Sequence, residues 1–343
     1  MWNRNPATTH SRGRCADGVG PRPAGRPAGW TAFYRLAAFL VLYCCTMALP
    51  ASAQVALLVE RGASTYQQAA QGFQQAFANT DRVEQIYLDE SSGALEPSLD
   101  RLRRNPPRLV VAIGTQAART ARERLPNLPI LYCLALRPIQ NQLVGANIGG
   151  IALDVELSRQ FENIRRALPN LRRIGVVYDE LTSGTLVRQA QQYLRSNVPL
   201  VVRDARTPQE AAREIQDLLS NVLGSEDAFW LLWDSVTANP ANFKLLVELS
   251  LRFKVPLIAP ARPFVEAGAL ISVGANYEQA GRQVAVMAQQ VLRGQARPEN
   301  FAAVPPAELA VTINGEVARR LGITFPPDLR ADVLAPAVGA RAP

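Results

Sequence analysis

Short apolar runs alternate with longer amphipathic segments along most of this chain. Runs of this length are typical of strands that are buried on both faces, and the segments between them have helical spacing. The alternation predicts an α/β protein in which parallel sheets are flanked by helices. The expected strands span residues 55–59, 83–88, 109–113, 130–134, 173–178, 200–203, 228–233 and 257–259.

Helices are expected between these strands, at residues 64–79, 94–103, 116–125, 185–196, 208–222 and 241–253. Ser64 has a residue type that is preferred at a helix N-cap. The last third of the chain departs from the alternation. There we expect a strand, a turn at 274–276, a long helix from Tyr277 to about Gly294, and then a short strand and a helix that ends near Gly322.

The two series of strands and helices resemble copies of one unit. Val59 and Tyr178 end comparable strands, and Thr115 and Asp234 follow comparable strands at the same sequence separation. This spacing predicts two similar α/β lobes, although generic strand–helix units can also produce it. In open parallel sheets a ligand lies outside the carboxyl ends of the strands. Two such edges facing each other form a cleft that can hold a small molecule.

Hydrogen-bonding side chains gather at the expected strand-to-helix junctions. Gly114 allows backbone to approach a ligand, and helix N-termini present free N–H groups there. The alternative is that these side chains only cap the helices that follow. The candidate binding residues from these junctions are Ser64, Thr115, Gln116, Thr182, Ser183, Asp234 and Ser235.

The first 53 residues differ from the rest in charge and hydropathy. They carry +5 of the net charge of +8, and an apolar run begins at Leu36. The run is short for a membrane span and is followed by Ala51-Ser52-Ala53, which fits an A-x-A cleavage site. We therefore expect a signal peptide over residues 1–53, with an extended N-region, and a mature periplasmic protein that begins at Gln54. An uncleaved membrane anchor is the alternative.

Removal of this leader changes the chemistry available to the protein. The leader contains His10, which is the sole histidine, and leaves Cys133 as the one remaining cysteine. An internal disulfide, Ser-His-Asp or Cys-His catalysis and most zinc sites are thereby excluded. Cys44 and Cys45 suggest lipidation, but Tyr43 is bulky where lipid attachment needs a small residue. We expect no cofactor, and the weakly basic mature chain gives no case for nucleic acid.

An enzyme remains an alternative, since two carboxylates across a cleft can act as acid and base. However, the sequence shows no nucleophile elbow, phosphate loop or metal-ligand pattern. The available carboxylates lie where binding residues are expected. These carboxylates are Glu60, Asp179, Asp234 and Glu278.

Several segments resemble one known family. They include LVVAIGTQAA from Leu109, PNLRRIGVVYD from Pro169, KVPLIAPARPFVEAGAL from Lys254 and LAVTINGEVARRLGITFP from Leu309. The chain resembles the substrate-binding proteins of ABC transporters with the type I periplasmic-binding-protein fold. It is nearest to the branch that includes members binding aromatic amino acids. The likeness covers essentially the whole mature chain.

The resemblance implies two lobes joined by chain crossings near residues 147, 262 and 304. The first lobe would comprise 54–147 plus 262–303, the second 148–261 plus 304–335, with a flexible tail at 336–343. A small polar ligand, such as an amino acid or a related compound, would lie in the cleft. The protein, which we expect to be a monomer, would deliver it to an ABC permease in the inner membrane. A ligand sensor without a permease is the alternative. Family contacts map onto Arg61, Ser64, Thr115, the loop from Tyr178 to Ser183, and Asp234.

Two positions depart from the family pattern. Leu136-Arg137-Pro138 replaces a Thr-Asp-Pro-like turn, and Asn147-Ile148-Gly149-Gly150 replaces Asn-Val-Thr-Gly. The first places a base where the family has an acid, and the second lacks a hydroxyl. Both argue against an aromatic amino acid as the ligand. Arg137 offers a bidentate contact to an anionic ligand instead.

Overall fold

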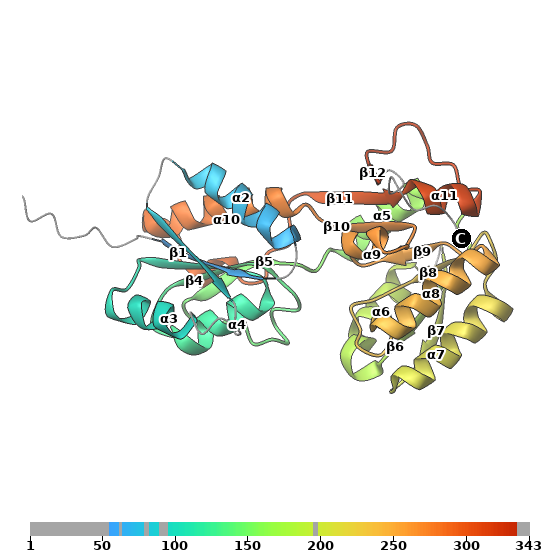
Figure 1. Cartoon of the computed structure of the whole chain (residues 1–343), viewed down its shortest axis with the longest axis horizontal. Helices are drawn as coiled ribbons and strands as arrows, with labels where there is room; N and C mark the ends of the chain where they lie inside the picture. Colours follow the sequence, from blue (N-terminus) through green and yellow to red (C-terminus); the bar gives the residue numbers. More distant parts are fainter. Residues whose placement is uncertain (1–54, 62–63, 79–81, 89–94, 195–197, 335–343) are drawn as a thin grey trace, which may run out of the picture. The chain divides into compact units, whose positions relative to one another are not determined.

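The computed structural model describes residues 55–61, 64–78, 82–88, 95–194 and 198–334. These residues belong to one compact unit of the chain, Ser52–Pro343. They form two sheets, each flanked by helices (Figure 1). The expected leader at 1–53 and tail at 336–343 lie outside the described residues. No helix in the described segments is long and apolar enough to cross a membrane.

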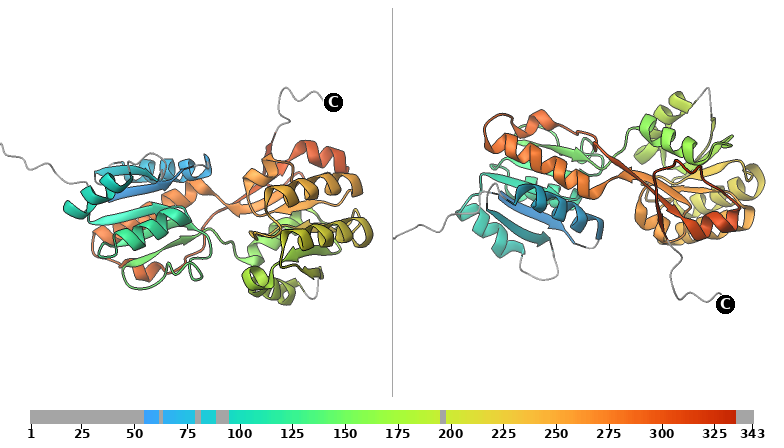
Figure 2. Two further views of the ribbon diagram at one scale, coloured as in Figure 1. Left: turned by 60° about the horizontal axis from the view of Figure 1, so that its bottom comes forward. Right: turned by 90° about the horizontal axis from the view of Figure 1, so that it is seen from above.

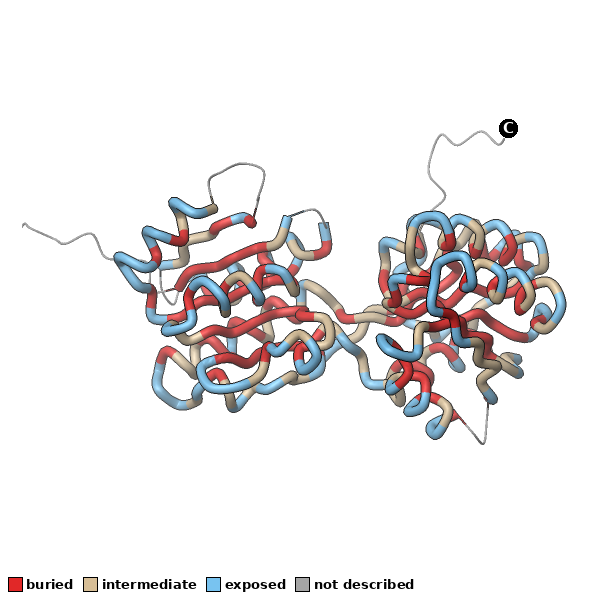
Figure 3. The backbone as a smooth tube through the Cα atoms, turned by 90° about the horizontal axis from the view of Figure 1, so that it is seen from below, coloured by how far each residue is buried: buried red, intermediate tan, exposed pale blue. Residues whose placement is uncertain are grey.

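The first sheet is parallel and has the strand order β2-β1-β3-β4-β5. Every residue of its third and fourth strands is buried, because helices cover both faces. Figure 3 shows that buried segments run through the interior of the molecule and that exposed segments lie mostly around it. This burial explains why the sequence shows unbroken apolar runs. The strands are β1 (Val55–Glu60), β2 (Val83–Leu88), β3 (Leu109–Ile113), β4 (Ile130–Ala135) and β5 (Ile148–Ala152).

Two pairs of helices cover the first sheet. Helices α2 (Ser64–Phe77) and α10 (Tyr277–Leu292) pack on one face, and α3 (Leu95–Arg104) and α4 (Thr115–Arg124) on the other. Figure 2 shows α2 and α10 side by side. Their backbones approach so closely that a Cβ on Gly281 would lie 2.0 Å from the carbonyl oxygen of Ala69.

The second sheet has the order β12-β11-β10-β9-β8-β6-β7, and its strands are parallel except that β11 runs antiparallel to β10. The strands are β6 (Ile174–Tyr178), β7 (Leu200–Asp204), β8 (Ala228–Trp230), β9 (Leu257–Ala259), β10 (Ile271–Ala275), β11 (Leu309–Asn314) and β12 (Asp332–Leu334). One face is covered by α5 (Leu157–Ala167), α6 (Glu180–Leu194) and α11 (Gly315–Leu321). The other is covered by α7 (Pro208–Asp217), the π-helical turn η2 (Leu218–Val222), α8 (Pro240–Phe253) and α9 (Arg262–Glu266).

The two sheets repeat one topology. The order β2-β1-β3-β4 of the first sheet corresponds to β7-β6-β8-β9 of the second. Val59 and Tyr178 lie at the carboxyl ends of the equivalent strands β1 and β6. Thr115 and Asp234 follow the equivalent strands β3 and β8. The expectation of two similar α/β lobes therefore agrees with the strand order.

Two of the expected chain crossings are in the wrong place. β5 pairs with β4 and so belongs to the first lobe, which moves the first crossing from 147 to residues 153–156. β10 pairs with β9 and so belongs to the second lobe, which moves the second crossing from 262 to Ala275–Tyr277. The proline-rich segment after β9 forms α9 within the second lobe rather than a connection. The third crossing begins close to the expected position, since Val304 still bridges Ile151 of the first sheet.

The start of α6 and the end of β8 also differ from expectation. Helix α6 begins at Glu180 rather than near Thr185, because the Asp179 carboxylate accepts a hydrogen bond from Leu181 N at 3.0 Å and caps the first turn. Strand β8 ends at Trp230 rather than Trp233. Thr182 and Ser183 therefore lie inside the first turn of α6, and Trp233 lies in the loop that follows β8.

Candidate ligand-binding site

The N-terminus of α4 is occupied by a carboxylate of the protein itself. Glu60, at the end of β1, accepts a hydrogen bond from Gln116 N at 2.9 Å. Gly114 precedes the helix with φ +99°, and a Cβ there would lie 2.4 Å from Glu60 Oε2. Burial raises the pKa of Glu60, and the backbone donors of Gln116 and Ala117 partly oppose this rise. The glycine is needed both for its backbone angle and for the approach of Glu60.

Thr115 holds a loop rather than capping its helix. Its Oγ1 accepts a hydrogen bond from Leu136 N at 2.9 Å, and the N-cap position of α4 is Gly114, which has no side chain to offer. The same loop is fixed by Asn141, whose side chain donates to Leu136 O at 2.7 Å. Thr115 therefore positions the segment that follows β4.

Three other first-lobe candidates lie at the same edge of the sheet. The Arg61 guanidinium lies 5.4 Å from the ring centroid of Tyr87, in a cation–π contact. Ser64 is exposed at the first residue of α2, and Gln116 is exposed in the first turn of α4. The exposed side chains of Ser64 and Gln116 are accessible at this edge.

Asp234 joins two loops at the carboxyl edge of the second sheet. It is 3% exposed, and its carboxylate accepts four hydrogen bonds from neutral donors. The donors to Oδ2 are Asp179 N at 3.0 Å, Thr182 Oγ1 at 3.0 Å and Ser183 Oγ at 2.7 Å, and Val236 N donates to Oδ1 at 3.0 Å. In this arrangement Asp234 fastens the start of α6 to the loop after β8.

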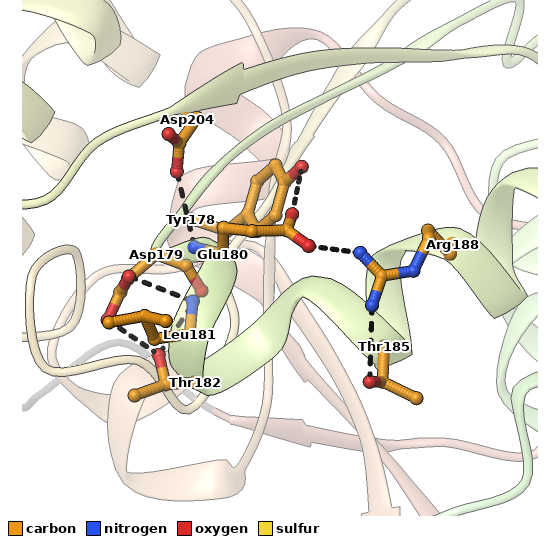
Figure 4. A network of polar contacts seen from close by, with 8 residues as sticks. All are labelled: Tyr178, Asp179, Glu180, Leu181, Thr182, Thr185, Arg188 and Asp204. Carbon is orange, nitrogen blue, oxygen red and sulfur yellow. Dashed lines mark hydrogen bonds and ion pairs between the residues drawn. The ribbon is translucent and has the colours of Figure 1, made fainter.

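Tyr178 is held within its own lobe by the network at the start of α6 (Figure 4). Its hydroxyl donates to Glu180 Oε2 at 3.0 Å, and Arg188 forms an ion pair with the same carboxylate. Burial and then Glu180 raise the pKa of Tyr178, and Arg188 lowers the pKa of Glu180. Asp204 accepts a hydrogen bond from Glu180 N at 3.2 Å. Ser235, the remaining candidate of this lobe, is exposed in the loop after β8.

Arg137 connects the two groups of candidate residues. It follows β4 of the first lobe, and its guanidinium contacts the second lobe through three neutral acceptors. Nη1 donates to Thr182 O at 2.7 Å, and Nη2 donates to Ser183 Oγ at 3.1 Å and to Trp233 O at 2.9 Å. The guanidinium is therefore engaged by protein atoms. No residue pattern indicates this contact, because its acceptors are mostly backbone oxygens.

A small cavity lies beside Arg137. Its volume is about 70 Å³, and its polar lining includes Arg137, Asp154 and Gln160. Ligand pockets generally have volumes of roughly 300–1,000 Å³, so this cavity is too small for an amino acid. Binding of such a ligand at this place requires that the surrounding side chains move.

The lack of a hydroxyl at position 149 has a packing explanation. A Cβ on Gly149 would lie 1.9 Å from the carbonyl oxygen of Pro298, in the short helix η3 (Pro298–Phe301) that packs on β5. Gly150 has φ +149°, and a Cβ there would lie 1.9 Å from Tyr132 O. This departure from the family pattern reflects close backbone packing in the first lobe.

All four candidate carboxylates are engaged by groups of the protein, and Asp179 caps α6 through Leu181 N. Glu60 lies at the N-terminus of α4, Asp234 is engaged by four donors, and Glu278 forms an ion pair with Arg282 on α10. The described segments contain no cluster of His, Cys, Asp and Glu that is suited to a metal ion.

The two α/β lobes, with hydrogen-bonding side chains at the carboxyl ends of their strands, are typical of a two-lobed binding protein. The sequence matches the family described as ABC transporter substrate binding protein over residues 53–335, and the chain belongs to this family. This family comprises binding proteins for the substrates of ABC transporters.

Individual relatives share limited sequence identity with the chain. A tyrosine-binding protein of Clostridioides difficile (strain R20291) is 24% identical over 196 residues, which are 55% of this chain and 55% of the relative. The chain thus matches about half the length of this curated relative.

Solved structures show the same fold. A ligand-free, open structure of a substrate binding protein with adhesive properties from Clostridium difficile is 20% identical, with 82% of this chain and 98% of that chain covered and a TM-score of 0.69. An ABC domain from Streptococcus pneumonia in complex with L-Trp is 24% identical, with 82% and 100% covered and a TM-score of 0.58. These likenesses establish the two-lobed periplasmic-binding-protein fold.

Proposed function

We propose that this chain is exported and captures a free amino acid with an apolar side chain between its lobes, for delivery to an ABC permease in the inner membrane. The contact of Arg137 with Thr182, Ser183 and Trp233 carries this proposal. It brings together the carboxyl ends of parallel strands from the two sheets, which is where ligands bind in such folds.

The class of ligand is supported by the relatives and by one exposed side chain. The named relatives are a tyrosine-binding protein and a domain in complex with L-Trp. Leu181, in the first turn of α6, is 93% exposed beside Thr182. An apolar ligand side chain would cover it and remove apolar surface from water. Two departures from the family pattern argued against such a ligand. In the structure Gly149 is explained by backbone packing, and Arg137 is engaged by the protein itself.

Export is supported by the position of the family match. The match begins at residue 53, where the expected cleavage site ends, so the Arg-rich leader lies outside the binding protein itself. The proposal further includes the roles of Ser64, Gln116, Thr182 and Ser235 as ligand contacts, since these side chains are exposed at the two edges.

A thermal-shift screen of the secreted protein tests this function. We expect L-tyrosine, L-tryptophan or another apolar amino acid to raise the melting temperature, because a ligand at about 100 times its Kd adds roughly 2.7 kcal/mol. Sugars and inorganic anions should have no effect. Mass spectrometry of the same material should show an N-terminus at Gln54.

Variants of exposed apolar residues sharpen the test. Leu181→Ser should weaken binding of the ligand identified in the screen. Val286→Ser, which alters a 53% exposed side chain on α10, should leave it unchanged. A protein that responds to sugars and to no amino acid would contradict the proposal.

A further inference from the structure

We propose that the second lobe contains a cation site which Arg137 occupies as a tethered competitor of the ligand's ammonium group. The inference rests on the proposed function for its ligand class, while the site itself rests on contacts in the structure. Three oxygens form the site: Thr182 O, Ser183 Oγ and Trp233 O.

The three oxygens suit a primary ammonium group as well as a guanidinium. They lie 2.7, 3.1 and 2.9 Å from the terminal nitrogens of Arg137, within ordinary hydrogen-bond distance. A primary ammonium has three donors and no acceptor. Ser183 Oγ and Trp233 O both accept from Nη2, so an ammonium nitrogen at that position would have these two acceptors, with Thr182 O, the partner of Nη1, beside them.

Ser183 is oriented to accept from a cation. Its hydroxyl has one hydrogen, which it donates to Asp234 Oδ2 at 2.7 Å, so its lone pairs face the Arg137 nitrogen. Ser183 is 1% exposed, which fixes this orientation. The negative charge of Asp234 thus acts on the site through one hydroxyl.

Two carboxylates act on the Arg137 guanidinium: Asp154, which interacts with it electrostatically, and Asp234, which is linked to it through the Ser183 hydroxyl. Asp234 accepts its four hydrogen bonds from neutral donors, and the Arg137 guanidinium donates to neutral oxygens. A carboxylate held beneath neutral acceptors favours a cation above them. This arrangement explains why a cation from the other lobe is seated here.

The loop of Arg137 is built to present its side chain. Arg137 has φ +44°, a left-handed conformation that is unfavourable for a residue with a Cβ. Its backbone N–H donates to Asp154 Oδ2 at 2.7 Å, in the segment that crosses to the second lobe. Thr115 and Asn141 hold the preceding residue, Leu136.

The functional consequence is a reduced apparent affinity. A ligand ammonium can enter the site only after Arg137 leaves it. The apparent affinity for the ligand is therefore the intrinsic affinity multiplied by the fraction of molecules in which the site is vacant. The small cavity beside Arg137 agrees with an occupied site. Arg137 thereby sets the concentration at which the protein fills with ligand.

Chemical rescue tests the site without knowledge of the ligand. Arg137→Ala should lower the melting temperature, and methylguanidinium should restore it in the variant but not in the unmodified protein. Methylurea, which has a similar shape and no charge, should not restore it. An unchanged melting temperature in Arg137→Ala, or recovery with methylurea as well as methylguanidinium, would overturn the cation site.

Calorimetry tests the competition. Arg137→Met should bind L-tyrosine or L-tryptophan roughly tenfold or more tightly than the unmodified protein. N-acetyl-L-tyrosine, which lacks the ammonium, should show no such gain. Arg173→Met is the matched control, since Arg173 forms an ion pair with Asp227 in the second lobe and its loss changes the net charge equally.

The remaining outcomes separate this inference from the proposed function. Equal or weaker amino acid binding by Arg137→Met would refute the competition. Failure of every amino acid to bind either protein would refute the proposed function and the competition, and the rescue experiment would still decide the cation site. If Arg137→Ala does not fold, Arg137→Lys, which keeps a cation in the site, should fold, and methylguanidinium should leave its melting temperature unchanged.

Discussion

Asp234 lies at a position where both a structural role and a ligand-binding role are expected. It lies where a ligand-binding carboxylate is expected, yet its oxygens accept hydrogen bonds from Asp179 N, Thr182 Oγ1, Ser183 Oγ and Val236 N. A buried carboxylate with this many donors is primarily a structural anchor of the site. Its influence on a ligand passes through Ser183.

Replacement of Asp234 should therefore reduce stability before it reduces specificity. Asp234→Ala leaves several buried donors unpaired and should lower the free energy of unfolding by about 3 kcal/mol. Asp234→Asn keeps the shape and should cost less. Urea denaturation of both variants provides the measurement. An unchanged unfolding midpoint together with lost ligand affinity would instead mean that Asp234 contacts the ligand directly.

The sequence located the candidate residues but not their partners. It placed Thr115, Thr182, Ser183 and Asp234 at strand ends, because residue type and strand–helix spacing are local properties. It could not show that Thr115 binds Leu136 N or that Arg137 reaches Trp233 O. Those contacts depend on how distant segments are placed in three dimensions and involve backbone atoms, which carry no residue signature.

Glu60, the last residue of β1, contacts the start of helix α4, and this contact makes the stability of the protein depend on pH. Glu60 at the end of β1 closes the helix with its carboxylate, and burial raises its pKa above the ordinary value of 4.5. The folded protein therefore binds this proton more tightly than the unfolded chain does. Stability from this group is greatest when the carboxyl is protonated and falls as the pH rises through its raised pKa.

Glu60→Gln should consequently gain stability relative to the unmodified protein as the pH increases from about 4.5 to neutrality. The amide oxygen can still accept from Gln116 N, so the helix start is kept. Melting temperatures of both proteins across this pH range provide the test, and Glu84→Gln at the exposed ion pair with Arg101 serves as the control. A difference that does not change with pH would show that Glu60 has no raised pKa.

Secondary structure was predictable where apolar periodicity dominates and less so where capping decides. The buried strands β1, β3 and β6 match the expected apolar runs closely. The early start of α6 depends on the Asp179 carboxylate, and the membership of β10 depends on pairing with β9. Pairing between strands is a long-range property, so the chain crossings were misplaced although the lobes themselves were expected.

The two lobes are each assembled from separated parts of the chain. Helix α10 follows β10 of the second sheet, yet it packs on α2 over the first sheet. The first lobe therefore depends on a helix that enters it through a crossing. Gly72 and Gly281 allow this packing, because a Cβ on either would lie about 2 Å from a backbone oxygen of the opposing helix.

Gly281→Ala should therefore loosen one lobe and spare the other. The added methyl would lie 2.0 Å from Ala69 O and 2.9 Å from Phe73 N, so α10 must move away from α2, at a cost of about 1–3 kcal/mol. Hydrogen exchange should then accelerate in β1 and β3 and remain unchanged in β6 and β8, since regions with separate cores open separately. Gly274→Ala is the control, because its Cβ would meet Pro260 O at an ordinary 3.5 Å. Equal acceleration in both sheets would show instead that the lobes unfold as one cooperative unit, with the Arg137 contacts and the crossings transmitting the loss from one core to the other.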